Sequence, residues 1–314
     1  RAFSATPAAA TPPGRPRAPA RWRTRARAEG GRTSPPRTAP KLQQGEFRPK
    51  QSLGQNYLSD PNIISKITSS FIESVLERCE AKPCQVVELG PGLGALTRHV
   101  HAEFPDMLAV ELDGRAVQVL RESLPALRVL HEDLLQVSYR SLADKVGGQV
   151  YVVANLPYYI VSDALLSLVR EPGAVRFAQL MVQSEVAQKC VAPPGTKLYG
   201  ALAATLQLYT RPRRLFTVPS TAFYPKPKVQ SAIVELDFLS EREMPKVDPA
   251  RLQEVISASF QQRRKLLRHS LAQLLQRQRA ALPPKWADVR GEQMKPQDLV
   301  EVAEAIFPYG MIPS

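Results

Sequence analysis

The fold of this chain is decided by the stretch Val86-Val87-Glu88-Leu89-Gly90-Pro91-Gly92-Leu93-Gly94. Its first half predicts a buried strand, its glycines predict a tight turn, and a helical pattern follows from about Ala95. Glycines let the backbone approach a ligand closely, and the start of a helix offers unpaired N–H groups to polar ligand atoms. The spacing lacks the last interval of the dinucleotide fingerprint G-x-G-x-x-G, so a nicotinamide cofactor is the less favoured ligand.

A second apolar run, Val150-Tyr151-Val152-Val153-Ala154, predicts a buried parallel strand that leads into Asn155-Leu156-Pro157-Tyr158. The proline presets its own backbone and holds the preceding residue extended, so an amide, a carbonyl and an aromatic ring can converge at the end of the strand. Open α/β sheets bind ligands at that end. The tetrapeptide suggests chemistry on the amine of a flat base, although a strand-to-turn segment can also contain these four residues by chance.

Acidic residues end two further apolar runs. Residues 107–110 lead to Glu111, and residues 127–131 lead to Asp133. A carboxylate at the end of a parallel strand can accept hydrogen bonds from both hydroxyls of a ribose. A second carboxylate can bind the amine of an adenine. Each acid alone is more often a solvated strand end, but their alignment with a glycine loop favours a nucleoside cofactor.

The apolar patterns together predict a doubly wound α/β sheet. Strands are expected near 85–89, 107–111, 127–131, 149–154 and 176–182, and helices near 63–76, 95–103, 114–122, 162–169 and 184–191. Residues 214–218 and 231–236 are expected to form an antiparallel pair at one sheet edge. Between them, the Pro-rich loop 219–228 is expected to lack regular structure.

Composition divides the chain into three segments: a disordered segment at 1–45, the α/β domain at 46–240, and a small all-helical domain at 241–314. The helical domain begins with a charged linker and carries a dense positive cluster. The cluster consists of Arg263, Arg264, Lys265 and Arg268, together with His269. Such a cluster suits contacts with RNA phosphates, and the alternative is a solvated helix face.

Positive charge is concentrated at the beginning of the chain. Residues 1–41 hold nine Arg and one Lys against one acid, so they contribute +9 of the formal net charge of +13. The remaining +4 does not by itself argue for nucleic-acid binding. This Pro-rich segment is predicted to be disordered and is typical of an organellar transit peptide. Its Pro, Ala and Thr content favours a plastid over a mitochondrion, and a disordered RNA-binding arm is the alternative.

The sequence disfavours a secreted or membrane-spanning protein and a metal-binding protein. The chain has no secretory core and no apolar run of about 20 residues, which excludes a membrane span. Its three cysteines, Cys79, Cys84 and Cys190, lack metal-ligand spacing. We therefore expect reduced thiols and no metal.

Six motifs occur in a fixed order, at residues 50–58, 88–97, 111–113, 132–133, 155–158 and 223–231. In this order they resemble the bacterial-type (KsgA-type) small-subunit ribosomal RNA adenine dimethyltransferases, which use S-adenosylmethionine. The resemblance covers roughly residues 50–307 and implies a Rossmann-like methyltransferase sheet. The chain departs from the family pattern at Tyr159, where Asn is usual, at Val161, which replaces a small hydroxyl residue, and at Gln230, which replaces Asp.

The resemblance also implies the roles of individual residues. The catalytic group would comprise Asn155, Leu156, Pro157, Tyr158 and Phe223. The cofactor would contact Gln55, Asn56, Leu58, Gly90, Gly92, Glu111, Leu112, Asp133 and Asn155. RNA would contact Lys50, Lys226, Lys228, Arg263, Arg264, Lys265 and Arg268.

The chemistry implied is methyl transfer to the exocyclic amine of adenine, whose lone pair is delocalised into the ring. Hydrogen bonds to the Asn155 side-chain oxygen and the Leu156 carbonyl would direct that lone pair at the methyl group. The target base must leave its stack, and contacts with Tyr158 and Phe223 would offset that cost. Plain core packing is the alternative for Phe223, and Tyr224 is a competitor for the stacking position.

The leading function is therefore dimethylation of two adjacent adenines in a small-subunit rRNA hairpin, on naked RNA or a maturing subunit, by a monomeric organellar enzyme. One alternative is a non-catalytic RNA-binding assembly factor or organellar transcription factor of the same fold. Another is a methyltransferase that acts on large-subunit rRNA, which the transit-like segment and the Leu-Pro-Tyr form of the motif disfavour.

Overall fold

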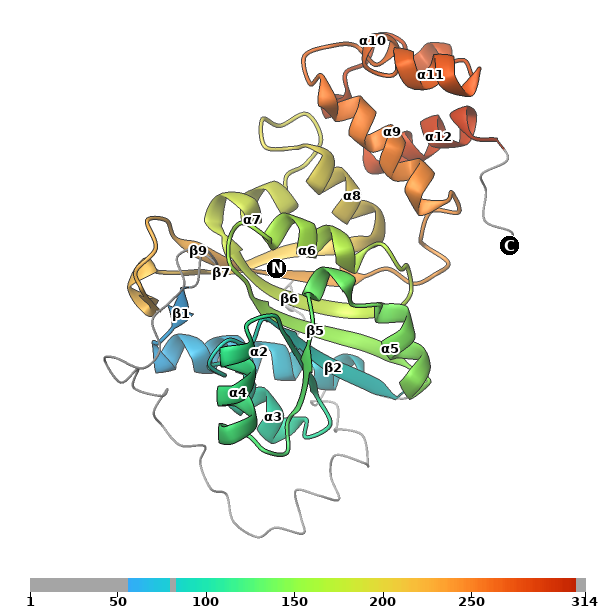
Figure 1. The fold of residues 1–314 in the computed structure, drawn as a ribbon. Coiled ribbons are helices and arrows are strands. Elements are labelled where there is room, and N and C mark those ends of the chain that lie inside the picture. The colour runs from blue at the N-terminus through green and yellow to red at the C-terminus, as the bar shows by residue number, and fades with distance from the viewer. Residues whose placement is uncertain (1–55, 80–82, 309–314) are drawn as a thin grey trace, which may run out of the picture.

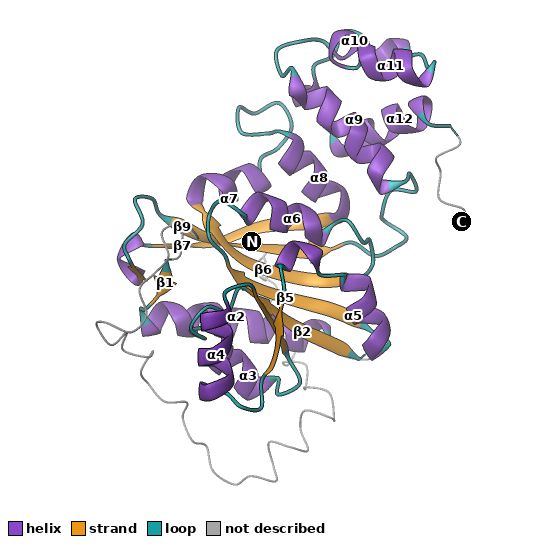
Figure 2. Ribbon diagram, in the orientation of Figure 1, coloured by secondary structure: helices purple, strands orange, loops and turns teal. Residues whose placement is uncertain are grey.

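The computed structural model describes residues 56–79 and 83–308. A seven-stranded sheet with the order β4-β3-β2-β5-β6-β9-β7 forms its centre (Figures 1 and 2). The strands are β2 (Cys84–Leu89), β3 (Leu108–Glu111), β4 (Arg128–His131), β5 (Gln149–Asn155), β6 (Val175–Gln183), β7 (Thr210–Val218) and β9 (Ser231–Phe238). Strands β2 to β6 pair in parallel, and β9 runs antiparallel to both β6 and β7. The predicted doubly wound sheet with an antiparallel edge pair is confirmed.

Helices cover both faces of the sheet (Figure 2). One face packs on α2 (Pro61–Arg78), α3 (Thr97–Glu103) and α4 (Gly114–Ser123). The other face packs on α5 (Tyr139–Val146), α6 (Val161–Leu168), α7 (Ser184–Cys190) and α8 (Ala201–Tyr209). Because apolar side chains are buried on both faces, β5 has no alternating pattern and reads as one continuous apolar run.

Local signals explain where the helices begin. The Asp60 side chain accepts hydrogen bonds from the N–H groups of Asn62 and Ile63, and Pro61 occupies the first turn, so α2 begins there. The helix predicted from residue 95 begins at Thr97 instead, because the glycine turn extends two residues further. Helices α5 and α8 and the last helix of the described residues were not expected from the sequence.

The Pro-rich loop contains regular structure, contrary to the prediction. Phe223 and Tyr224 form the two-residue strand β8, which pairs with β1 (Tyr57–Leu58). The prolines do not prevent this pairing, because both residues of β8 precede Pro225 and retain their N–H groups. The pairing brings the beginning of the described chain beside a segment that follows it by more than 160 residues.

The C-terminal helices form a group that packs on α8 (Figure 1). They are α9 (Pro249–Gln261), α10 (Leu267–Ser270), α11 (Ala272–Gln278) and α12 (Pro296–Ile306). Their buried side chains continue the core that lies between the sheet and α5 to α8. The predicted C-terminal helical part is confirmed, and its division from the sheet at residue 240 stays a prediction. The segment 1–45, with the predicted disorder, lies outside the described residues.

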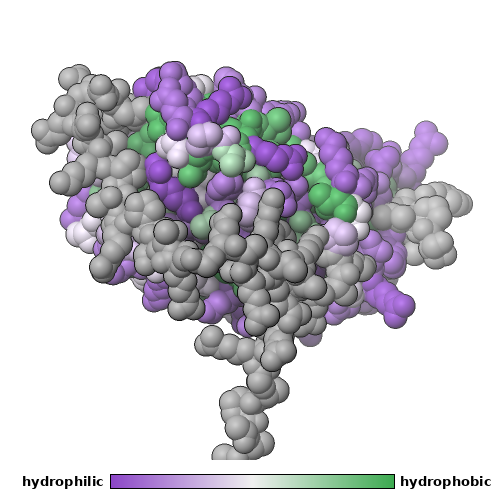
Figure 3. All heavy atoms as spheres, turned by 90° about the horizontal axis from the view of Figure 1, so that it is seen from below, coloured by the Kyte–Doolittle hydropathy of each residue, from purple (hydrophilic) through white to green (hydrophobic). Residues whose placement is uncertain are grey.

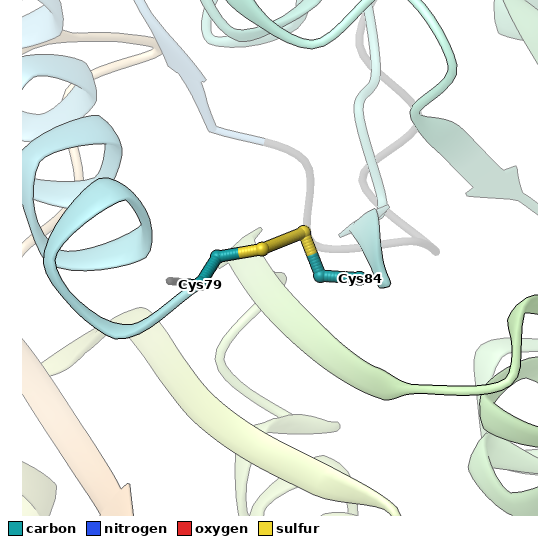
Figure 4. The surroundings of a disulfide bond; sticks show 2 residues. All are labelled: Cys79 and Cys84. Carbon is teal, nitrogen blue, oxygen red and sulfur yellow. A yellow bond between two sulfur atoms is a disulfide. The ribbon is translucent and has the colours of Figure 1, made fainter. Parts of the chain in front are cut away.

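The prediction of three reduced thiols is wrong for two of them. Cys79, directly after α2, and Cys84, the first residue of β2, form a disulfide with their Cα atoms 6.6 Å apart (Figure 4). Cys190 is a free, buried thiol. A short sequence separation does not reveal whether two side chains face one another, so this pairing became visible only with the fold.

The surface of the described residues is mixed in polarity. Seen from below the view of Figure 1, hydrophilic side chains surround smaller hydrophobic areas among the described residues (Figure 3). None of the described helices is long and apolar enough to cross a membrane.

Candidate active site

A cavity opens at the carboxyl ends of β2, β3 and β5. The strand order reverses between β2 and β5, and open α/β sheets bind ligands at such a switch point. The cavity is lined by Asn56, Tyr57, Leu58, Ser59, Gly90, Pro91, Gly92, Leu93, Ala95, Val110, Glu111, Leu112, Asp113, Glu132, Asp133, Leu134, Asn155, Leu156, Pro157, Tyr159 and Ile160. The structure thus brings together all the predicted cofactor residues that it describes. Gln55, like the RNA candidate Lys50, lies outside the described residues.

The glycine loop forms the floor of the cavity. Gly90 and Gly92 have φ angles of 62° and 54°, a region in which other residues are strained. A Cβ atom on Gly90 would lie 2.9 Å from Cδ2 of Leu156, and one on Gly92 would lie 3.2 Å from the ring of Tyr57. Only glycine therefore lets this backbone lie against the cavity walls.

Glu111 is buried and fixed by two backbone N–H groups. Its carboxylate accepts hydrogen bonds from Gly92 N at 3.0 Å and from Asp113 N at 2.8 Å. Each of the two bonds uses a different oxygen, so each oxygen keeps a lone pair for a further donor. A carboxylate held in this way suits the vicinal hydroxyls of a ribose.

Leu112 and Asp133 form the next part of the cavity wall. Leu112 is 55% exposed and offers an apolar surface to a flat ring. His131 Nε2 donates to the Leu112 carbonyl oxygen at 3.1 Å and so steadies the loop that presents this side chain. Asp133 accepts one hydrogen bond from Leu135 N and retains capacity to accept an amine.

The predicted catalytic tetrapeptide lies beside this wall. Asn155 ends β5, and Asn155, Leu156 and Pro157 all line the cavity. Tyr158 does not line it: its half-buried ring has its hydroxyl 2.8 Å from Oγ of Ser231. Burial raises the pKa of Tyr158, and the hydrogen bond with Ser231 opposes that shift.

The aromatic residues near the tetrapeptide are placed differently from one another. Phe223 is 6% exposed, belongs to the core cluster between the sheet and α2 to α4, and does not line the cavity in this structure. The neighbouring Tyr224 is 57% exposed. Tyr159, at a position where the family usually has Asn, is 62% exposed and lines the cavity. The stacking role of Phe223 stays a prediction.

Sequence reasoning missed two residues of the site. Tyr57 packs against Gly92, and burial, with the charges of Asp113 and Glu111, raises the pKa of its hydroxyl. Glu88 lies under the glycine loop with 1% exposure. Burial raises the pKa of Glu88 to about 8; the charge of Glu111 adds to this and the hydroxyl of Thr97 opposes it. A charged residue type inside a strand buried on both faces was the available signal.

Two residues of the predicted positive cluster form ion pairs within the protein. Arg263 Nε lies 2.6 Å from a Glu292 carboxylate oxygen, and its guanidinium also donates to the Thr196 carbonyl at 3.0 Å. Arg268 forms an ion pair with Asp288. The exposed cations Arg264, Lys265, Lys226 and Lys228 form no ion pair with another residue of the described chain. The described side chains also contain no His, Cys, Asp and Glu group arranged to hold a metal.

The sequence profile of the family described as ribosomal RNA adenine dimethylase matches residues 46–302. The chain belongs to this family. Its members transfer methyl groups from S-adenosylmethionine to adenines of ribosomal RNA.

Two bacterial relatives of this dimethylase chain are both named ribosomal RNA small subunit methyltransferase A. The protein of Salinibacter ruber is 38% identical over 258 residues, which cover 82% of this chain and 84% of the relative. The protein of Shouchella clausii is 32% identical over 290 residues, which cover 87% of this chain and 95% of the relative. The similarity therefore extends over nearly the whole length of these proteins.

Solved structures support the same fold. A dimethyladenosine transferase from Plasmodium falciparum matches with a TM-score of 0.60 and 20% identity, and covers 78% of this chain and 95% of its own. The 23S rRNA methyltransferase ErmE matches with a TM-score of 0.55 and 24% identity, covering 79% of this chain and all of its own. At these identities, the likeness is one of fold.

The residues of the cavity fit S-adenosylmethionine. Gly90 and Gly92 let the loop backbone pack against Leu156 and Tyr57 at the floor of the cavity. Glu111 is set to receive ribose hydroxyls, and Leu112 and Asp133 offer an apolar surface and an acceptor to adenine. The cofactor end near Asn155 would then carry the transferable methyl. The residues predicted to hold the cofactor and the residues predicted to hold the amine thus line one cavity of the dimethylase.

Proposed function

We propose that this dimethylase modifies two adjacent adenines of a small-subunit ribosomal RNA hairpin during ribosome maturation. The observation that carries the proposal is the position of Asn155 and Leu156, which share one cavity with the glycine loop and Glu111. The names of the bacterial relatives support the choice of the small subunit. The presence of Asn155, Leu156 and Pro157 in that cavity argues against the non-catalytic alternative.

In the proposed reaction, the protein orients the amine and needs no strong base. The Asn155 side-chain oxygen and the Leu156 carbonyl oxygen accept hydrogen bonds from the N–H groups of the amine, which favours a pyramidal nitrogen with its lone pair directed into the cavity. S-adenosylmethionine supplies an electrophilic methyl group bound to a positively charged sulfur. Alignment of the two reacting atoms contributes much of the acceleration, and the methylated amine then releases its proton to water.

The wider setting of the enzyme is also part of the proposal. We infer that the exposed cations of the C-terminal helices and of the Pro-rich segment contact RNA phosphates, and that the enzyme acts as a monomer. The Arg-rich composition of residues 1–45 supports delivery to an organelle, with the plastid favoured over the mitochondrion. A fusion of these residues to a fluorescent protein would test delivery, and cytosolic fluorescence would overturn it.

The decisive experiment uses the full chain, labelled S-adenosylmethionine and small ribosomal subunits that lack the modification. We expect label in the small-subunit RNA and dimethyladenosine among its nucleosides. Binding of subunit and cofactor without label would favour the assembly-factor alternative. In a parallel reaction that supplies large subunits, label found only in large-subunit RNA would favour the methyltransferase that acts on large-subunit rRNA.

A further inference from the structure

Ser231 holds a hydroxyl in a rigid position beside the active site. It is the first residue of β9 and is fully buried. Its backbone pairs with Gln183 of β6 on one side and with Val218 of β7 on the other. A residue fixed by two neighbouring strands cannot shift without disturbing the sheet, so its Oγ is a fixed reference point.

The hydroxyl at the tip of the Tyr158 ring forms a hydrogen bond with this Oγ atom. This hydroxyl lies 2.8 Å from Oγ of Ser231, across 73 residues of sequence. Pro157 restrains the backbone in front of Tyr158, and Pro157 O accepts a hydrogen bond from Ile160 N, which closes the turn. The first side-chain torsion sets the direction of the ring axis, and the hydrogen bond at the ring tip fixes that direction. The plane of the ring is held less tightly, through the preference of the O–H bond for the ring plane.

We propose that Ser231 is a positioning residue, which holds the Tyr158 ring in the direction needed to stack on the target adenine. This inference rests on the proposed function. Stacking of one base on an aromatic ring is worth about 1–3 kcal/mol, but only a ring already in place delivers that energy without an ordering cost. The predicted second stacking partner, Phe223, is buried. Stacking on the target adenine therefore depends mainly on the orientation of Tyr158.

The segment that leads into Ser231, residues 219–231, also forms hydrogen bonds with the cofactor side of the cavity. The Ala222 carbonyl accepts hydrogen bonds from Ser59 N at 2.8 Å and from the Ser59 hydroxyl at 3.2 Å. Leu58, which lines the cavity, pairs with Phe223. Residues 219–231 therefore connect a wall of the cofactor cavity to the ring of Tyr158, and place both relative to one segment.

Three variants and one control separate positioning from a purely structural role. Ser231→Ala and Tyr158→Phe each remove the hydrogen bond, and Tyr158→Phe keeps the ring. The third variant combines both changes. Thr221→Ala is the control, because it removes an exposed hydroxyl from the same segment.

The first measurement is the single-turnover rate of methyl transfer with saturating small subunits. We expect each single variant to lose about tenfold, within the range that the loss of one base stack allows, and the double variant to lose the same. The dissociation constant for S-adenosylhomocysteine should stay within twofold of the native value, because Tyr158 does not line the cavity. Thr221→Ala should match the native protein in both measurements.

The second measurement is the equilibrium constant for unfolding, which does not depend on activity. Loss of one hydrogen bond predicts that the unfolding constant rises about fivefold in each single variant. It should also rise about fivefold, rather than 25-fold, in the double variant, because both changes remove the same bond. Single-turnover rates within twofold of native would overturn the proposal and leave a structural bond. Rate losses that multiply in the double variant would also overturn it. If the native protein makes no dimethyladenosine, the proposed function fails, and this inference fails with it.

Discussion

Asn155 and Glu88 represent two kinds of polar residue at this site. Asn155 ends β5 and lines the cavity, where its amide can meet a substrate. Glu88 precedes the glycine loop and is almost fully buried, and it does not line the cavity. The first residue is expected to affect the reaction, and the second is expected to affect the pH dependence of stability.

Replacing Asn155 with Ala should reduce turnover and spare the cofactor. The side-chain oxygen acts mainly in the transition state, so kcat should fall by about 100-fold or more, the scale seen on removing one transition-state hydrogen-bonding group. The dissociation constant for S-adenosylhomocysteine, measured by calorimetry, should change by less than about threefold. Near-native turnover would remove Asn155 from the catalytic role.

Replacing Glu88 with Gln should flatten the pH dependence of stability. Burial raises the pKa of Glu88 in the folded protein to about 8, from an ordinary value of 4.5. Between these two values the folded state holds a proton that the unfolded state has released. The free energy of unfolding of the native protein should therefore fall as pH rises through this window, by up to about 1.4 kcal/mol per pH unit from this group.

Urea unfolding at pH 5.5, 6.5 and 7.5 would measure this effect. The quantity to compare is the difference in free energy of unfolding between the native protein and Glu88→Gln. The difference should shift in favour of the variant as pH rises. A difference that is constant over these pH values would show that Glu88 titrates normally.

At the scale of elements, the glycine loop between β2 and α3 decides the shape of the cavity floor. Its backbone is held by a hydrogen bond from Gly90 N to Val110 O, which joins the loop to the end of β3. The disulfide of Cys79 and Cys84 joins α2 to the opposite end of β2. Strand β2 is thus fastened at both ends, and the glycine loop begins from a fixed position.

Gly90→Ala should damage both stability and cofactor binding. A left-handed backbone costs an alanine about 1–2 kcal/mol, and the new Cβ would lie 2.9 Å from the Leu156 side chain. Gly147→Ala is a matched control, because Gly147 has the same φ of 62° but no atom within 4 Å of the added Cβ. Both variants should melt at lower temperature, but only Gly90→Ala should bind S-adenosylhomocysteine more weakly. Equal cofactor affinity in the two variants would contradict this account of the loop.

At the scale of the whole molecule, two adjacent arginines at the end of α9 have different surroundings. Arg263 bridges Glu292 and the Thr196 carbonyl, and Gly195 N donates to the Glu292 carbonyl at 2.7 Å. These contacts join the loop before α8 to the C-terminal helices. Arg264 is exposed, so its charge is available to a ligand.

Arg263→Ala and Arg264→Ala should therefore differ, although each removes one positive charge. Arg264→Ala should reduce the slope of RNA affinity against salt by about 0.7–0.9, the effect of one phosphate contact. Arg263→Ala should lower the melting temperature by about 2–4 °C, the shift per kcal/mol for a protein of this size. Filter binding at several salt concentrations and thermal melts would compare them. Identical behaviour of the two variants would mean that the ion pair does not distinguish these residues.

The sequence by itself determined the main sheet, its antiparallel edge and the strand-end residues Gly90, Glu111, Asp133, Asn155 and Leu156, which line the cavity. These features follow from local rules: apolar runs form buried strands, glycines allow left-handed turns, and parallel strands end at the same edge. Residues placed by these rules converge whenever the sheet forms. The prediction therefore needed no knowledge of contacts between distant side chains.

Only the tertiary structure decided which distant side chains meet. The pairing of β1 with β8, the bond between Tyr158 and Ser231, the disulfide and the Arg263–Glu292 pair all depend on how separate segments pack. The same packing buried Phe223 and left Tyr159 exposed, although both are aromatic residues beside a recognised motif. Burial and pairing are properties of the folded surroundings, and a residue's own sequence neighbourhood does not specify them.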